Sequence, residues 1–80
     1  MELNELKTFI FEDLLGVGES GKFSSEDNLL SLGLDSLKMM RLIAFIEEKF
    51  SIVIPDIEIT PDRMENLASI EQLINKYKQP

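Results

Sequence analysis

The segment Gly33-Leu34-Asp35-Ser36-Leu37 has the residue types and order in this sequence that best suit a chemical role. A loop turns there into a long predicted helix, and Ser36 stands at the first helical position. The start of a helix tolerates a phosphate well, because unpaired N–H groups and the positive end of the helix dipole face it. Ser36 is therefore placed to carry a phosphodiester.

The Ser36 hydroxyl is not expected to react unaided. The sequence contains neither His nor Cys, so the usual general base at neutral pH and the most reactive nucleophile are both missing. A separate enzyme is then needed to activate the hydroxyl. The alternative interpretation is structural, because a serine at an N-cap accepts a hydrogen bond from a first-turn amide and needs no further role.

The same missing residues argue against an enzyme. Carboxylates are plentiful, but paired acid and base catalysis needs a cleft that drives their pKa values apart, and a domain this small offers little of one. The acidic stretch 19–27 lacks the spacing of a calcium-binding EF-hand loop. We therefore expect no catalytic residue and no metal site.

Length and charge narrow the class of protein further. Eighty residues without Cys predict a single domain over residues 1–80 that is stabilised by packing alone. A formal net charge of −7 repels a nucleic-acid backbone and favours basic surfaces on partner proteins. Residues 1–5 are acidic and no long apolar run follows, so we expect neither a signal peptide nor a membrane span, and a cytoplasmic location by default.

The elements that position Ser36 are predicted to be helical. Residues 3–14 carry apolar side chains at spacings of three and four, which is typical of an amphipathic helix that ends before Gly16. Residues 16–35 are predicted to form a long loop held by its own hydrophobic residues. Residues 36–50 contain no Gly or Pro and predict the strongest helix. Its buried face is predicted to consist of Met39, Leu42, Ile43, Ile46 and Phe50.

The remainder of the chain predicts a connector and two further helices. Residues 52–54 are β-branched and precede Pro55, which favours an extended connector. Thr60 is the predicted N-cap of a short helix that ends near Asn66, and Ser69 begins the last helix. The expected fold is all-α, a four-helix bundle of three longer helices and one short helix, with a long loop between the first and second helices.

A second apolar flank on the helix 36–50 consists of Leu37, Met40 and Ala44. A small protein can hardly cover both this flank and the predicted buried face. The flank is either packed at the edge of the core or exposed as a partner surface, and the pattern alone favours neither.

The segment Leu32-Gly33-Leu34-Asp35-Ser36-Leu37, followed by an amphipathic helix, resembles the phosphopantetheine attachment site of acyl and peptidyl (aminoacyl) carrier proteins. The helix end 45–50, the connector 52–56 and the Leu15-Gly16-Val17 end of the first helix are also similar to that family. The resemblance therefore covers nearly the whole chain.

The resemblance implies that a phosphopantetheinyl transferase moves the phosphopantetheine arm from coenzyme A onto Ser36, and that Asp35 helps this transferase bind. The thiol of the arm would hold a cargo as a thioester for a loading enzyme and a downstream synthase or transferase. The family likeness favours a monomer. The second helix would dock the partner enzymes through Leu37, Met40, Arg41, Ala44, Glu47 and Glu48.

Two departures from fatty-acid carriers point to a specialised biosynthetic pathway. Lys38 and Arg41 place positive charge where those carriers are usually acidic, and the segment 56–70 is longer than usual. The cargo is expected to be acyl, as in fatty-acid or polyketide synthesis, or aminoacyl, as in a nonribosomal-peptide-type pathway. The competing hypothesis is an unmodified helical adaptor in which Ser36 only caps the helix.

Overall fold

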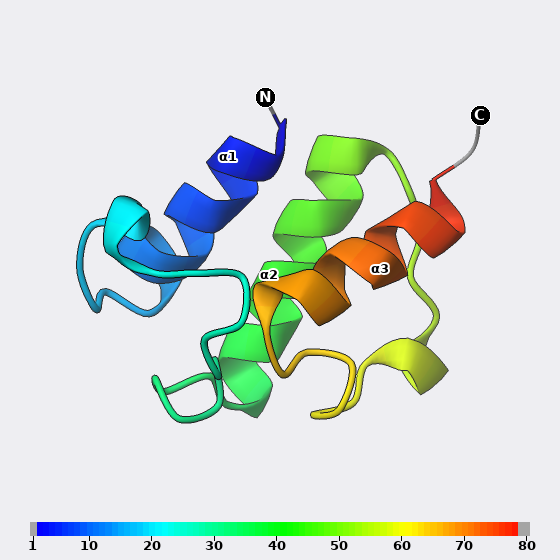
Figure 1. The fold of residues 1–80 in the computed structure, drawn as a ribbon. Helices are drawn as coiled ribbons and strands as arrows, with labels where there is room; N and C mark the ends of the chain where they lie inside the picture. The colour runs from blue at the N-terminus through cyan, green and yellow to red at the C-terminus, as the bar shows by residue number, and fades with distance from the viewer. Residues whose placement is uncertain (1, 79–80) are drawn as a thin grey trace.

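Three α-helices and two long connections make up residues 2–78, the part of the chain that the computed structural model describes. The helices are α1 (Glu2–Thr8), α2 (Ser36–Phe50) and α3 (Leu67–Tyr77) (Figure 1). Residues 2–78 contain no β-strand. The all-α prediction is therefore confirmed.

The first predicted helix changes its winding after Thr8. Residues Phe9–Leu14 form a π-helical segment, in which the Leu15 amide donates to the Ile10 carbonyl at 2.9 Å, five residues back. The predicted apolar positions are buried at Leu6, Ile10 and Leu14, whereas Leu3 is 40% exposed. The segment then ends before Gly16, whose φ of +62° is a left-handed conformation that suits a residue without a Cβ.

Helix α2 has the predicted bounds and buries the predicted face of Met39, Leu42, Ile43, Ile46 and Phe50. It ends at Ser51, which has a left-handed φ of 56°, and the Ser51 and Ile52 amides both donate to the Glu47 carbonyl. In the connector that follows, Ile52 and Ile54 are buried and Val53 is 78% exposed. This alternation is the one expected of an extended segment.

The short helix predicted from Thr60 is not formed, and that prediction is wrong. A 3-10 turn at Asp56–Glu58 comes first, and the chain then makes one turn in which the Arg63 and Met64 amides both donate to the Thr60 carbonyl at 3.1 Å. Since α3 starts soon afterwards, too few residues remain for further helical turns.

Helix α3 begins at Leu67 and not at Ser69. The Asn66 side chain accepts a hydrogen bond from the Ser69 amide at 2.8 Å and is therefore the N-cap. Because the helix begins two residues before Ser69, both Ser69 and Gln72 lie inside it. They therefore do not form the predicted capping box.

The connection between the first helix and α2 contains a 3-10 turn at Ser20–Lys22 and is held in place by buried leucines and backbone hydrogen bonds. Leu29 is fully buried and Leu34 is 5% exposed. The Leu29 amide donates to the Glu65 carbonyl at 2.8 Å, and the Ala68 amide donates to the Ser25 carbonyl at 3.1 Å. The loop is thereby joined to the segment that leads into α3.

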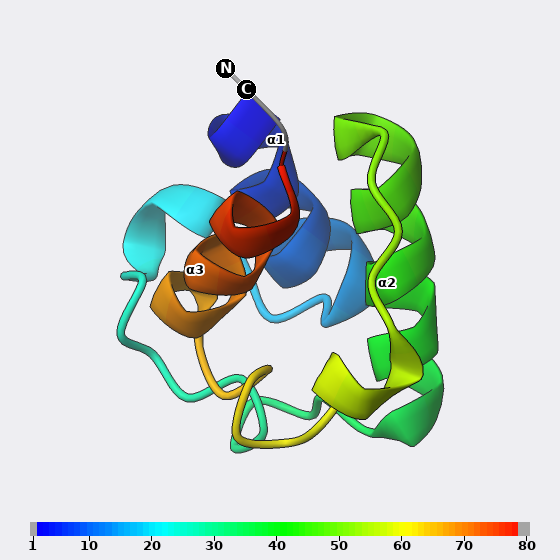
Figure 2. The same cartoon turned by 90° about the vertical axis from the view of Figure 1, so that its right-hand side faces the viewer.

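The helices are arranged so that α3 crosses in front of α2, with α1 beside them (Figures 1 and 2). Both views place the start of α1, the end of α3 and the C-terminal end of α2 at one end of the molecule. The N-terminal end of α2 lies at the opposite end, beside the two connecting loops. Within residues 2–78, none of the helices has the length and apolar character needed to cross a membrane.

Candidate functional site

Ser36 is the first residue of α2, and its side chain is exposed. Its hydroxyl takes part in no hydrogen bond with any residue from 2 to 78. The hydroxyl is therefore free for a group to be attached to it.

Asp35, and not Ser36, is the N-cap of α2. It has extended backbone angles, and its Oδ1 atom accepts a hydrogen bond from the Lys38 amide at 2.9 Å. The interpretation of Ser36 as a simple helix cap is therefore wrong, because the neighbouring carboxylate already has that role. The structure brings the two predicted site residues together, with Asp35 as the cap and the Ser36 hydroxyl unbonded within residues 2–78.

The turn before Asp35 is fixed by backbone hydrogen bonds. The Leu29 carbonyl accepts from the amides of Leu32 at 3.1 Å and Leu34 at 3.0 Å. Gly33 adopts a φ of +112°, a conformation that side chains strongly disfavour. The Lys38 ammonium folds back over this turn and donates to the Gly33 carbonyl at 3.4 Å. The approach to Ser36 is thus a defined turn.

The second apolar flank of α2 is exposed. Leu37 is 70% exposed, Met40 is 56% exposed, and Ala44 and Arg41 are also exposed. Since Ser36 begins the same helix, it adjoins apolar side chains that the rest of residues 2–78 does not cover. The second apolar flank is therefore a free surface within residues 2–78 and is not packed at the edge of the core.

The two acidic residues predicted on the same surface differ in their environments. Glu47 is half-buried, and its Oε2 atom accepts a hydrogen bond from the Ile54 amide at 2.8 Å. Glu48 is exposed. Glu47 therefore holds the connector after α2 in place, while the Glu48 carboxylate faces solvent.

A buried acidic junction was not predicted from the sequence. Glu58 is 4% exposed, and its carboxylate accepts hydrogen bonds from Arg63, from Lys76 Nζ at 2.6 Å and from Tyr77 Oη at 2.5 Å. The sequence Ile57-Glu58-Ile59 does not predict a buried Glu58. An alternating pattern of this kind normally places the isoleucines inside and the glutamate outside, yet Ile57 is 82% exposed.

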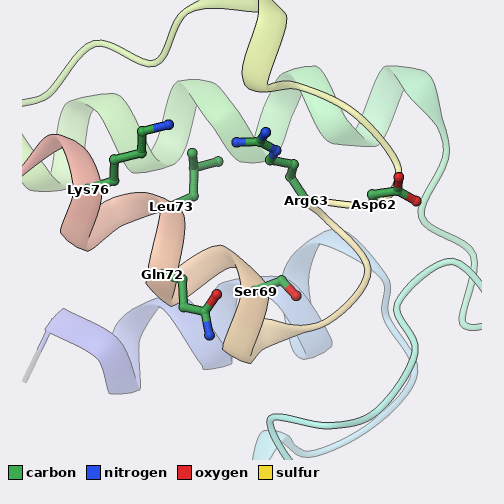
Figure 3. Close-up of a pocket in the computed structure, with 6 residues that line it drawn as sticks. All are labelled: Asp62, Arg63, Ser69, Gln72, Leu73 and Lys76. Atoms are coloured by element: carbon green, nitrogen blue, oxygen red, sulfur yellow. The ribbon is translucent and has the colours of Figure 1, made fainter.

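The junction adjoins a groove of about 310 Å³ between the turn at residues 62–63 and α3. Figure 3 shows the Arg63 and Lys76 side chains extending toward one another along this groove. Both cations are paired with Glu58, whose single carboxylate balances one of their two positive charges. The groove is part of the structural junction that holds the connecting segment against α3.

Comparison with known proteins gives a family match over most of the chain. Residues 8–76 match the family model described as the phosphopantetheine attachment site. The acyl carrier protein of Campylobacter fetus is 35% identical over 72 residues, which cover 90% of this chain and 86% of that protein.

Two further relatives come from Bradyrhizobium diazoefficiens. Its aminoacyl carrier protein 2 is 33% identical over 49 residues, 61% of this chain and 55% of that protein. Its aminoacyl carrier protein 1 is 33% identical over 52 residues, 65% of this chain and 58% of that protein. The chain thus spans little more than half the length of these two relatives.

Proposed function

This chain belongs to the phosphopantetheine attachment site family, and we propose that it is a carrier protein whose arm is attached to Ser36. The observation that carries this proposal is the free, exposed hydroxyl at the first residue of α2, beside an Asp35 that already caps the helix. As a member of a family of carriers, the chain is not an enzyme.

The residues at the start of α2 fit a phosphodiester. Asp35 occupies only the Lys38 amide, so the amides of Ser36 and Leu37 have no acceptor within residues 2–78. These two groups and the helix dipole favour a negative charge there. When attached, phosphopantetheine supplies a thiol that holds the cargo as a thioester, a group that a chain without Cys lacks.

The exposed flank of α2 is the proposed docking surface for partner enzymes. Leu37, Met40 and Ala44 supply apolar contact area beside Ser36, and Arg41 and Glu48 supply charge. Asp35 is proposed to contribute to transferase binding. We propose that Glu47 acts indirectly, since its carboxylate is engaged with the connector.

The proposed partners are a phosphopantetheinyl transferase, a loading enzyme and a downstream synthase or transferase of a specialised biosynthetic pathway. The proposed cargo is an acyl or an aminoacyl group, since relatives named for each of them match the chain. We further propose a monomeric single domain in which residues 56–66 take the place of the short helix of a four-helix bundle.

The proposal is tested by the intact mass of the chain after incubation with coenzyme A, magnesium and a broad-specificity phosphopantetheinyl transferase. The expected result is one added arm on the native chain and none on Ser36→Ala. Ser31→Ala is the matched control, because it removes an exposed hydroxyl from the neighbouring loop and should still be modified. An unmodified native chain with several transferases, or an arm on Ser36→Ala, would overturn the proposal.

A further inference from the structure

A surface groove between α1 and α2 contains two stacked aromatic rings. The Phe9 and Phe45 ring centroids are 4.1 Å apart and the ring planes differ by 4°. Both rings are only half-buried and line a hollow of about 340 Å³. A second hollow of about 390 Å³ adjoins it, because Phe45 and Lys49 line both. Because the stacked rings cover each other's inner faces, the aromatic floor of the groove consists of their outer faces and edges.

The charges around this floor are mainly negative. Lys49 is paired with Glu5 at 3.0 Å, so the groove's lysine is already neutralised. Asp13 lines the first hollow and Glu48 lines the second, and both are exposed and form no ion pair within residues 2–78. Two unpaired carboxylates therefore flank the aromatic rings.

We propose that this groove docks an arginine-bearing segment of a partner protein. A guanidinium group stacks on aromatic rings and binds carboxylates in a bidentate manner, so one side chain satisfies both features of the groove. A second copy of this chain fits poorly, because each copy has a formal net charge of −7 and the two would repel one another.

The groove lies on the opposite edge of α2 from Ser36. Phe45 follows Ser36 by nine positions, which is about two and a half turns at 3.6 residues per turn. Glu48 belongs both to the second hollow and to the proposed docking surface, so a protein bound at Phe9 and Phe45 leaves Ser36, Leu37 and Met40 accessible but covers Glu48. Beyond the proposed carrier function, this arrangement lets one partner retain the chain while other proteins act at Ser36.

The test uses the full ¹⁵N-labelled chain and a short capped peptide of leucine and arginine, with a matched peptide that carries citrulline in place of arginine. The expected amide shifts are concentrated at residues 8–13 and 45–49. The citrulline peptide should bind about tenfold more weakly, because it keeps the shape of arginine and loses its charge.

Two pairs of variants separate the groove from general attraction to an acidic protein. Phe45→Leu should weaken arginine-peptide binding about tenfold, whereas Phe23→Leu makes the same change in the separate Phe11–Phe23 stack and should not. Asp13→Asn should weaken binding, and Glu26→Gln in the exposed loop should not. No binding, equal binding by both phenylalanine variants, or shifts centred on residues 19–27 would overturn the proposal, as would a concentration-dependent dimer without peptide.

The independence of the two edges is tested by the transferase reaction with the peptide present at saturation. The expected rate of arm addition to Ser36 is unchanged. Addition that the peptide blocks would contradict the two-edge arrangement. If the chain without peptide takes no arm, the carrier function fails, while the groove is still judged by the shift measurements.

Discussion

Asp35 and Ser36, two neighbouring residues at the start of α2, differ in role, because Asp35 is the helix cap and Ser36 is the proposed attachment point. The Asp35 carboxylate satisfies the Lys38 amide at 2.9 Å, so Ser36 is not needed to hold the helix end. A modified Ser36 can therefore bear a bulky group without any loss of the cap.

The cap predicts a specific stability effect. Asp35→Ala should lower the free energy of unfolding by about 1 kcal/mol, because the Lys38 amide loses its acceptor. Asp35→Asn keeps an acceptor oxygen and should lower the free energy of unfolding by only a few tenths of this amount. Urea unfolding followed by circular dichroism measures both, with the exposed Asp62→Ala as control. Equal values for Asp35→Ala and Asp62→Ala would contradict the assignment.

The Glu58 junction predicts a larger effect. Glu58→Gln should lower the free energy of unfolding by about 2 kcal/mol, because the amide presents a donor to groups that are themselves donors. The loss is limited because the Arg63 and Lys76 side chains are 47% and 57% exposed and can regain water.

Tyr77→Phe removes one of these bonds and should cost about 1 kcal/mol in the same unfolding experiment. Glu65→Gln is the control, because its side chain is exposed and its carboxylate forms no hydrogen bond or ion pair within residues 2–78. A Glu58→Gln protein as stable as Glu65→Gln would show that the junction contributes nothing.

The position of Ser36 at a helix start could be predicted from the sequence, because the loop before it and the strong helix after it are both recognised from neighbouring residues. Asp35 as the cap was not foreseen, since either neighbour suits an N-cap and only the backbone angles decide between them. The burial of Glu58 could not be predicted, because two of its three donors, Lys76 and Tyr77, lie 18 and 19 residues further along the chain.

The end of α2 has an unusual backbone conformation. Ser51 is the one residue other than glycine with a positive φ within residues 2–78, at 56°. Ser51→Gly should therefore raise the free energy of unfolding by about 0.5 kcal/mol, since glycine relieves the left-handed strain but adds freedom to the unfolded chain.

The matched control for this prediction is Ser31→Gly, which makes the same change at an exposed serine without positive φ. It should leave stability unchanged or lower it. Thermal and urea unfolding of the two variants give the comparison. A destabilised Ser51→Gly protein would show that the left-handed residue is not the limiting feature of this helix end.

The bounds of α2 were predictable because one long stretch lacks Gly and Pro and keeps a single apolar period. The segment 60–66 was not, since Thr60-Pro61-Asp62 has good starting signals but only a few residues before Asn66 starts the next helix. The π-helical segment Phe9–Leu14 was also missed, because the four-residue spacing of Leu6, Ile10 and Leu14 suits an α-helix and does not reveal the wider turn.

At the scale of the whole molecule, the loop 16–35 contributes Leu29 and Leu34 to the hydrophobic core. Leu29 is as completely buried as Leu42 of α2. Leu29→Ala should therefore lower the free energy of unfolding by about 2–4 kcal/mol, a loss like that of Leu42→Ala, because each leaves a cavity. The half-buried Leu30→Ala should cost less.

Urea unfolding followed by circular dichroism compares the three leucine variants. We expect a single transition in which the free energy of unfolding depends on urea concentration with an unchanged slope, because the loop and the helices share one core. If Leu29→Ala proved no more costly than Leu30→Ala, the loop would be a surface feature.

The start of α1 and the end of α3 lie at one end of the molecule, and the start of α2, where Ser36 stands, lies at the other (Figures 1 and 2). An affinity tag, a fluorescent protein or a solid support can therefore be joined at either side of the sequence without crowding Ser36. Arrays of this domain fixed to a surface would all present Ser36 outward. With the proposed arm on Ser36, the same geometry would make the domain a convenient handle for enzymatic labelling of a fused protein.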